Sequence, residues 1–358
     1  MQDFTAGNTA PPSSQSATCG VPALDTRIRQ LVADFGCEKS CELIEDMIAT
    51  ALRMGRDQTT MADLKLFSRS LKELRYAASV FAPYRDTRKV VVFGSARTAA
   101  TEPESVAAEE FARRMHEEHG FMTITGGGEG IMGAAQRGAG RENSFGLNIR
   151  LPFEQQANET IHGDPKLINF NYFFTRKLNF LKETDAVALF PGGFGTMDEG
   201  FEVLTLMQTG KARIIPVVCV DKPGGRYWET WFRFLRHDLL ELGLISEDDF
   251  HLFKMTHSVD DAIAEIARFY RTYHSSRWVG QRLVMRLVKS LTPAAVAHLN
   301  EGFADILVGG EIVQGPALHE ERNEPELAAL PRLVLSPKRK NFGRFRQLID
   351  AINTAETE

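Results

Sequence analysis

Two short apolar runs in this sequence end directly in glycine-rich turns, and this feature constrains the fold more than any other. Residues 121–125 run into the triple glycine at 126–128, and residues 186–190 run into the Pro-Gly-Gly at 191–193. A pattern typical of a helix follows each turn. A buried strand, a tight turn and a helix in succession form the repeating unit of parallel α/β sheets.

The same alternation extends over the middle of the chain. A β-branched run at 90–93 is typical of a fully buried parallel strand. Further strands are predicted at 144–149, 169–172 and 214–220, and helices at 104–118, 175–183, 197–208 and 228–240. The expected fold class is therefore α/β, a Rossmann-like parallel sheet with helices on both faces, plus N- and C-terminal helical extensions. In such sheets ligands bind beyond the carboxyl ends of the strands, where both glycine clusters fall.

The composition changes along the chain and predicts four segments. Residues 1–20 are rich in Ser, Thr, Pro and Gly, which favours a disordered leader. We expect a helical N-terminal segment at 21–84, a nucleotide-binding catalytic domain at 85–275 and a C-terminal helical extension at 276–358. Within the extension, residues 278–291 have the pattern of an amphipathic helix.

Charge and cysteine usage exclude several classes of function. The net charge of −5 is small for 358 residues, which argues against nucleic acid as a partner. The basic stretch 338–346 is interpreted as a solvated tail. The four cysteines and nine histidines show no metal-ligand spacing, so we expect no metal. No signal peptide or membrane-spanning run is found, and we expect a cytoplasmic protein that does not bind membranes.

The first glycine turn, 125–135, has the setting of an anion site. Glycines allow a tight turn whose N–H groups face an anion, and the start of a helix adds partial positive charge. No Gly-Lys-Ser/Thr follows, so the turn is not a Walker loop. No acid that would bind a ribose follows the next strand, so it is not a clean dinucleotide fingerprint either.

The second turn, 191–199, lies in the same setting and adds two acids. Thr196 can cap the helix or offer its hydroxyl to a phosphate. Asp198 is interpreted as an ordinary acid of the first helical turn. Two anion-binding turns with a carboxylate just behind the second match a nucleotide site that leaves one acid free for catalysis. Glu199 is the candidate for this acid, because cleavage of a nucleotide's glycosidic bond passes through a cationic sugar that a carboxylate can stabilise.

Four motifs in this order make the chain resemble the LOG (Lonely Guy) family. They are GSAR at 94–97, GGGxGxMGA at 126–134, FTRK at 174–177 and PGGFGTMDE at 191–199. The resemblance spans roughly residues 88–240. Family members are phosphoribohydrolases that release the base from nucleoside 5′-monophosphates, including cytokinin ribotides, and many relatives carry the label of lysine decarboxylase.

The resemblance implies a role for each matching residue. Arg176 and Glu199 are the expected catalytic pair, while Lys177 is interpreted as a surface neighbour. The residues expected to bind the phosphate or the ribose of the substrate are Ser95, Arg97, Gly127, Gly128, Gly130, Gly195, Thr196 and Glu202.

The expected reaction is hydrolysis of the N-glycosidic bond of a nucleoside 5′-monophosphate, without any cofactor, by a homo-oligomer. The helical preface and the long C-terminal extension resemble the longer bacterial forms, so a general purine or pyrimidine 5′-nucleotide nucleosidase is an alternative. A non-catalytic nucleotide-binding or carrier protein is another. A decarboxylase is disfavoured, because no lysine is set in a site for pyridoxal phosphate. Trp228 and Trp231 are interpreted as core or interface residues.

Overall fold

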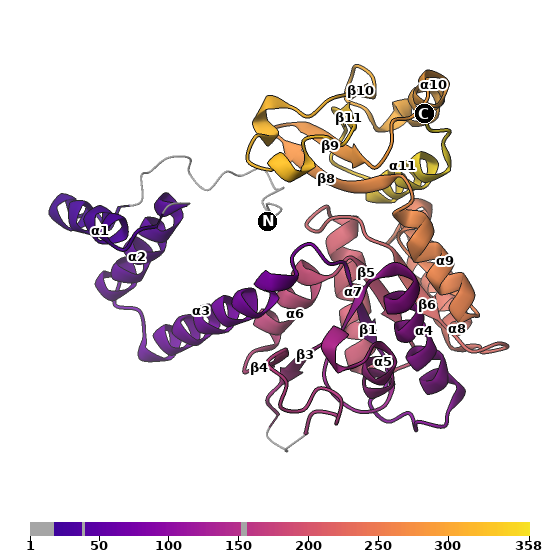
Figure 1. Ribbon diagram of the computed structural model, residues 1–358, viewed down its shortest axis with the longest axis horizontal. Helices are drawn as coiled ribbons and strands as arrows, with labels where there is room; N and C mark the ends of the chain where they lie inside the picture. The colour runs from indigo at the N-terminus through magenta and orange to yellow at the C-terminus, as the bar shows by residue number, and fades with distance from the viewer. Residues whose placement is uncertain (1–17, 38–39, 152–155) are drawn as a thin grey trace. The chain divides into compact units, whose positions relative to one another are not determined.

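The computed structural model describes residues 18–37, 40–151 and 156–358 (Figure 1). These residues form two units, one ending at Tyr76 and one running from Ala77 to Glu358. The leader predicted for 1–20 lies outside the described residues except for its last three. The predicted N-terminal helices are present, and Cys19 and Ile28 pack against Ala49 in a small core. They are α1 (Pro22–Asp34), α2 (Cys41–Arg56) and α3 (Met61–Phe81).

The larger unit is built on a seven-stranded sheet in which every neighbouring pair is parallel, as the sequence predicted. The order is β4-β3-β2-β1-β5-β6-β7. The strands are β1 (Lys89–Phe93), β2 (Met122–Thr125), β3 (Ser144–Ile149), β4 (Leu167–Phe170), β5 (Ala186–Leu189), β6 (Val217–Val220) and β7 (Lys254–Thr256).

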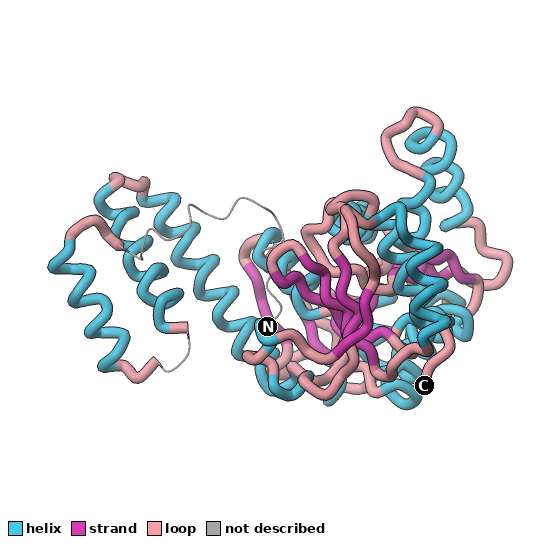
Figure 2. The backbone as a smooth tube through the Cα atoms, turned by 90° about the horizontal axis from the view of Figure 1, so that it is seen from above, coloured by secondary structure: helices cyan, strands magenta, loops and turns pink. Residues whose placement is uncertain are grey.

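Helices cover both faces of this sheet, so its strands are seen between two helical layers in Figure 2. The alternation of β1 sets the two faces: Val91 and Phe93 point into one core, and Val90 and Val92 into the other. The end of α3 with α6, α7 and α8 packs on the first face, and α4, α5 and α9 pack on the second. Their bounds are α4 (Pro103–His119), α5 (Ile131–Ala139), α6 (Phe173–Glu183), α7 (Phe194–Gln208), α8 (Tyr227–Phe234) and α9 (Val259–Phe269). Trp228 and Trp231 lie in the first core, which confirms their interpretation as core residues.

The strand order reverses its direction between β1 and β5. Val91 pairs with Val187 across this point, while β2 lies on the other side of β1. A reversal of this kind leaves a crevice at the carboxyl ends of the two strands, because their following connections leave in opposite directions. The predicted loops after β1, β2 and β5 are therefore brought to one edge of the sheet.

The C-terminal part contradicts the sequence-based expectation of a helical extension. It contains a four-stranded sheet of order β10-β11-β9-β8, whose paired strands are all antiparallel. The helix predicted for 278–291 is wrong, since this stretch contributes to β8 (Tyr273–Val279) and β9 (Arg282–Leu287). The remaining elements are β10 (Val313–Gly315), β11 (Arg332–Leu335), α10 (Pro293–Phe303) and α11 (Phe342–Thr354).

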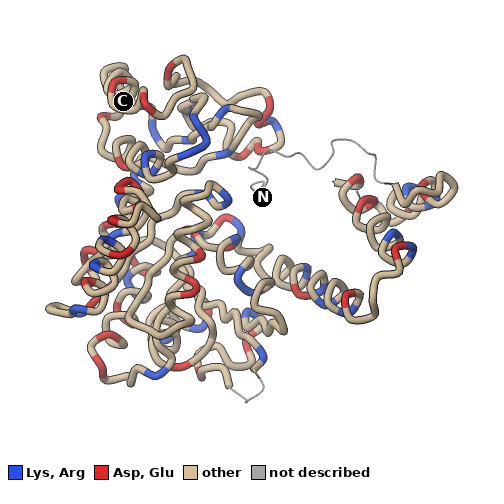
Figure 3. The backbone as a smooth tube through the Cα atoms, turned by 180° about the vertical axis from the view of Figure 1, so that it is seen from behind, with Lys and Arg blue, Asp and Glu red and all other residues tan. Residues whose placement is uncertain are grey.

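The basic stretch 338–346 is not the solvated tail that was expected. Arg346 is 2% exposed and pairs with Glu265 of α9 at 2.5 Å and with Asp350 at 3.1 Å. Arg344 pairs with Asp305 at 2.7 Å. The charges of Arg344 and Arg346 are therefore paired within the fold, while Lys338 and Lys340 are exposed. Figure 3 shows acidic and basic positions interspersed along the elements.

Candidate active site

Ser95, just after β1, connects the two glycine turns. Its N–H donates to the carbonyl oxygen of Pro191 at 3.1 Å, and its own carbonyl oxygen accepts from the N–H of Ile131 at 3.0 Å. The first contact reaches the turn after β5, and the second reaches the start of α5 after the turn at 126–130. The structure thus brings together the loops that the sequence predicted to act jointly.

Two glycines allow this close approach. Gly130 has a φ of +66°, and a Cβ added there would lie 2.3 Å from the carbonyl oxygen of Ser95. A Cβ on Gly192 would lie 2.1 Å from the hydroxyl oxygen of Thr196. Both positions therefore require glycine for packing, independently of any ligand.

Several polar groups at this edge are suited to an anion. Phe194 and Gly195 are the first two residues of α7, and such N–H groups have no acceptor within the helix. Thr196, the next residue of α7, is buried, and its hydroxyl lies beside Gly192 of the same turn. Gly127, by contrast, donates its N–H to the hydroxyl of Thr125 at 2.9 Å, so this group is already used inside the turn.

Asn158, which the sequence analysis did not identify, holds the first glycine turn in place. Its buried side-chain amide lies 3.1 Å from the carbonyl oxygen of Gly127 and 2.9 Å from that of Gly128. The same amide lies 2.6 Å from the side-chain oxygen of Gln136 on α5. Asn158 belongs to no motif of the sequence, and only its position in space indicates its role.

Arg176 lies beside the first turn, near the start of α6. Its Nε donates to the carbonyl oxygen of Leu147 at 2.9 Å, and a Cβ on Gly126 would lie 3.0 Å from its Nη2. The guanidinium carbon lies 5.1 Å from the centre of the Phe180 ring. Burial lowers the pKa of Arg176, whereas Glu199 and Asp198 act in the opposite direction. The guanidinium is thus fixed at the end of β3 with its Nη2 directed to the glycine turn.

Glu199 is a carboxyl group buried in the first turns of α7. Its side chain is 8% exposed. Burial raises its pKa to about 7, while the positive charges of Lys177 and Arg176 lower it. A buried acid that titrates near neutral pH, at the carboxyl edge of a parallel sheet, is typical of a functional site.

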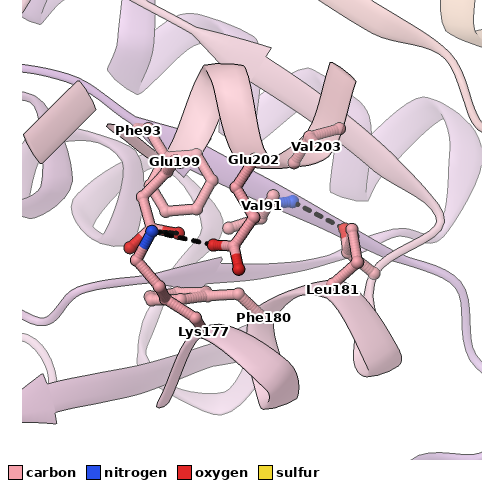
Figure 4. A pocket seen from close by; sticks show the side chains of 9 residues that line it. Val91, Phe93, Lys177, Phe180, Leu181, Glu199, Glu202 and Val203 are labelled. Atoms are coloured by element: carbon pink, nitrogen blue, oxygen red, sulfur yellow. Dashed lines mark hydrogen bonds and ion pairs between the residues drawn. The ribbon is translucent and has the colours of Figure 1, made fainter. Parts of the chain in front are cut away.

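Lys177 was expected at the surface, and the structure corrects this. Its side chain is 16% exposed, and Nζ lies 2.8 Å from Asp198. It also lies 2.8 Å from Glu202 and 4.0 Å from Glu199, as drawn in Figure 4. The signal that could have found it is its place directly after Arg176, opposite three acids within five residues of α7.

The position of Lys177 also bears on the decarboxylase label, since a lysine does lie in the site. Burial alone lowers its pKa, but hydrogen bonds to Asp198 and Glu202 outweigh this, and the net pKa is raised. A lysine that forms a Schiff base must lose its proton. The contacts of Lys177 stabilise the protonated form instead.

Two further predicted site residues, Arg97 and Glu202, lie closer to solvent than Glu199. Arg97 is exposed, and its backbone N–H donates to the hydroxyl of Ser95 at 3.0 Å. Glu202 is bound to Lys177 through a side chain that is 32% exposed.

Among the described residues, no group of three or more His, Cys, Asp or Glu side chains is arranged to hold a metal ion. No described helix is both long and apolar enough to cross a membrane.

Comparisons with known proteins find relatives of the parallel α/β part of the chain. The profile of a family described as "Possible lysine decarboxylase" matches residues 132–266, which include Arg176 and Glu199. A relative from Oryza sativa subsp. japonica, named "Probable cytokinin riboside 5′-monophosphate phosphoribohydrolase", is 25% identical over 193 residues. The alignment covers 53% of this chain and 75% of the relative.

Over this part of its length the chain is similar to the LOG family. Similar solved structures include the molybdenum cofactor carrier protein of Chlamydomonas reinhardtii, with a TM-score of 0.34 and 22% identity over 50% of this chain and 94% of that chain. Another is the molybdenum cofactor binding protein of Rippkaea orientalis, with a TM-score of 0.32 and 20% identity over 50% and 93% of the two chains. The LOG match ends within α9, so the antiparallel sheet that follows lies outside it.

Proposed function

We propose that this protein hydrolyses the N-glycosidic bond of a nucleoside 5′-monophosphate and releases the free base and ribose 5-phosphate. The observation that carries the proposal is the buried carboxyl of Glu199, with a pKa of about 7, directly behind the glycine turn at 191–195. Similarity to the LOG family and the name of the rice relative support the same reaction class.

The phosphate of the substrate would occupy the edge where the two turns meet. The turn at 126–130, the first N–H groups of α7 and the hydroxyl of Thr196 supply hydrogen-bond donors there. Ser95 holds the turns together through its backbone contacts. Binding the 5′-phosphate in this position would leave the ribose next to the start of α7, within reach of Glu199.

The chemistry then needs one water molecule and two side chains. Glu199 would stabilise the positive charge that develops at C1′, or accept a proton from the attacking water. The bond from C1′ to the base nitrogen breaks, the oxygen of water bonds to C1′, and the base leaves with a proton. Arg176, which is fixed by Leu147, would orient the nucleotide through a permanent positive charge. Water is the sole co-reactant, so no redox cofactor is required.

Substrate breadth and assembly belong to the same proposal. The name of the rice relative suggests a cytokinin riboside monophosphate, and AMP has the same phosphoribosyl part. A general purine or pyrimidine nucleotide nucleosidase uses the same groups of the site with a more open base pocket. We propose a homo-oligomer acting in the cytoplasm as the working form.

The test is to incubate the purified protein with AMP, GMP, CMP, UMP and isopentenyl-AMP and to measure the released base by chromatography. The matching nucleosides without phosphate are run in parallel. We expect release from at least one monophosphate and a much slower release from its nucleoside. Glu199→Gln should reduce the rate by about 10²–10⁴-fold while nucleotide binding persists.

Two outcomes contradict the proposal. Tight calorimetric binding of nucleotides without any release of base would indicate the non-catalytic alternative, a binding or carrier protein. Equal cleavage of nucleosides and their monophosphates would show that the glycine turns do not hold a phosphate.

A further inference from the structure

The ammonium group of Lys177 lies between acids of the facing helix. Nζ is 2.8 Å from a carboxylate oxygen of Glu202 (Figure 4) and 2.8 Å from one of Asp198, and Glu199 lies between these two acids in the sequence. The third contact, 4.0 Å to Glu199, is an ion pair at the limit of direct interaction. Lys177 therefore has two firm partners, and it faces the buried acid without a short hydrogen bond to it.

The positive charge of Lys177 compensates for the hydration that the Glu199 carboxylate loses when it is buried. A carboxylate with a side chain only 8% exposed loses most of its hydration, so its ionised form needs a nearby positive charge. The charged groups that act on Glu199 come from α6 and α7: Lys177 and Arg176 are positive, Asp198 and Glu202 negative. The β1 residues that line the pocket are Val91 and Phe93, which are apolar.

The two positive groups are held in different ways. Arg176 is tied to the backbone of β3 through Leu147, on the side of the first glycine turn. Among the described residues, the ion pairs of Lys177 are with acids of α7, the helix that carries Glu199. Its ammonium group thus follows Glu199 if the helix moves, and a long flexible side chain is kept in one place.

We propose that Lys177 is a positioning residue, which Asp198 and Glu202 hold in place so that its positive charge keeps the Glu199 carboxylate ionised. The effect that this has on kinetics rests on the proposed function. The charge effect itself does not depend on that function. Asp198 and Glu202 thereby act on the reaction through Lys177.

The expected consequence is a shift in the titration of Glu199. Its pKa, which burial raises to about 7, includes the lowering effect of Lys177. Removing the ammonium charge should raise this pKa by about one unit or more, as for other carboxylates that lose a cation within 4–6 Å. At pH 7 the ionised fraction of Glu199 would then fall from about one half to about one tenth for a rise of one unit.

The experiment compares Lys177→Met, Lys177→Arg and a matched control, Lys182→Met, in the full chain. Lys182 lies on the same helix and pairs with Glu183 instead of the site acids. The protein is labelled with ¹³C in glutamate carboxyl groups, and the Glu199 signal is identified by its loss in Glu199→Gln. Carboxyl shifts are followed from pH 5 to pH 9, and the pH profile of kcat/KM is measured for the same variants.

We expect the midpoint of Glu199 to rise in Lys177→Met, to be restored in Lys177→Arg and to stay unchanged in Lys182→Met. The acid limb of the kcat/KM profile should move upward with it. An unchanged midpoint in a folded Lys177→Met variant would overturn the proposal and leave Lys177 a structural tie between α6 and α7. If the wild type releases no base from any nucleotide, the proposed function fails, while the carboxyl titration still decides the role of Lys177.

Discussion

The side-chain amide of Asn158 lies 2.9 Å from the carbonyl oxygen of Gly128 and fixes the backbone of the first glycine turn from behind. Asn158 is 3% exposed, so water cannot replace this contact easily. A turn that binds an anion through its N–H groups must hold its carbonyl groups away from the anion. Asn158 satisfies two of these carbonyl oxygens, those of Gly127 and Gly128, on the protein side.

Replacing Asn158 with leucine should therefore weaken substrate binding more than it slows the chemical step. The carbonyl oxygen of Gly127 keeps the backbone N–H of residue 158 as a donor, but that of Gly128 loses the side-chain amide. A buried acceptor left without its donor costs about 1–3 kcal/mol of stability. We expect KM for the nucleotide to rise about tenfold or more, because a loss of 1.4 kcal/mol in phosphate binding corresponds to that factor. Steady-state kinetics and urea denaturation measure the two effects.

The matched control is Asn300→Leu. Asn300 also binds backbone through its amide, at 3.0 Å from the carbonyl oxygen of Ile312, but in the C-terminal part of the chain. It should lose stability with no change in KM. Equal KM values for both variants would show that Asn158 has no connection with the ligand.

The two glycine positions 130 and 195 should respond differently to alanine. Gly130 has a positive φ and no room for a Cβ, so Gly130→Ala should lose about 2 kcal/mol or more of folding free energy. At Gly195 no atom lies within 4 Å of an added Cβ, and Gly195→Ala should fold normally. If the backbone of α7 approaches a phosphate there, the added methyl group should raise KM and leave the folding free energy unchanged. Thermal melts and kinetics of both variants test this, and a normal KM in Gly195→Ala would place the phosphate elsewhere.

The parallel sheet could be predicted because its signals are local. A run such as Val90–Phe93 is buried on both faces and cannot be mistaken for a half-exposed element. The C-terminal sheet could not be predicted in the same way. Leu283, Met285 and Leu287 alternate along β9, yet with their neighbours they also fit a helical stripe. The deciding signal was Gly280, whose φ of +59° forms the turn between β8 and β9.

The candidate site shows the same division between local and distant information. The glycine turns were identified from their own residues, and parallel strands of one sheet necessarily bring such turns to one edge. The ammonium of Lys177 reaches Asp198 because of the packing of α6 against α7 on the sheet. The sequence of α6 or α7 alone does not specify how the two helices pack against each other. Asn158 reaches the turn from 30 residues away for the same reason.

Glu199→Gln should stabilise the protein at high pH while it removes activity. The folded-state pKa of Glu199 is about 7, above the ordinary value of 4.5, because burial disfavours the charge. The wild-type protein therefore loses stability as the pH rises from about 4.5 through 7, when this carboxyl must ionise inside the fold. Glutamine avoids that cost, which amounts to at most about 3 kcal/mol.

Urea denaturation of wild type and Glu199→Gln at pH 5 and pH 8.5 measures this effect. The stability difference in favour of the variant should grow between the two values. The exposed Glu142→Gln variant serves as the control for the change in net charge. A difference that shrinks with pH would mean that Glu199 is ionised at little cost.

The last prediction concerns the buried ionic network that holds the C-terminal sheet. Glu321 accepts from Arg286 on β9 at 2.7 Å and from Arg332 on β11 at 3.0 Å, and both arginines are fully buried. Removing the charge of Glu321 leaves two buried guanidinium groups without their shared partner. Glu321→Gln should therefore cost about 3–5 kcal/mol. The neighbouring Glu320, which pairs with Arg282 at the surface, offers a control in which Glu320→Gln costs about 0–1 kcal/mol.

The same network should make this part of the chain sensitive to acid. Burial alone raises the pKa of Glu321, but its hydrogen bonds from Arg332 and Arg286 outweigh this and hold it below the ordinary value of 4.5. Its stabilising contribution is present above about pH 4.5 and is lost as the pH falls through the lower folded-state pKa. Hydrogen exchange of β9 and β11 at pH 7 and pH 4 should show this loss in the wild type. In Glu321→Gln, the exchange of these strands should already be fast at pH 7, because a neutral amide has no charge to lose and cannot hold the two arginines.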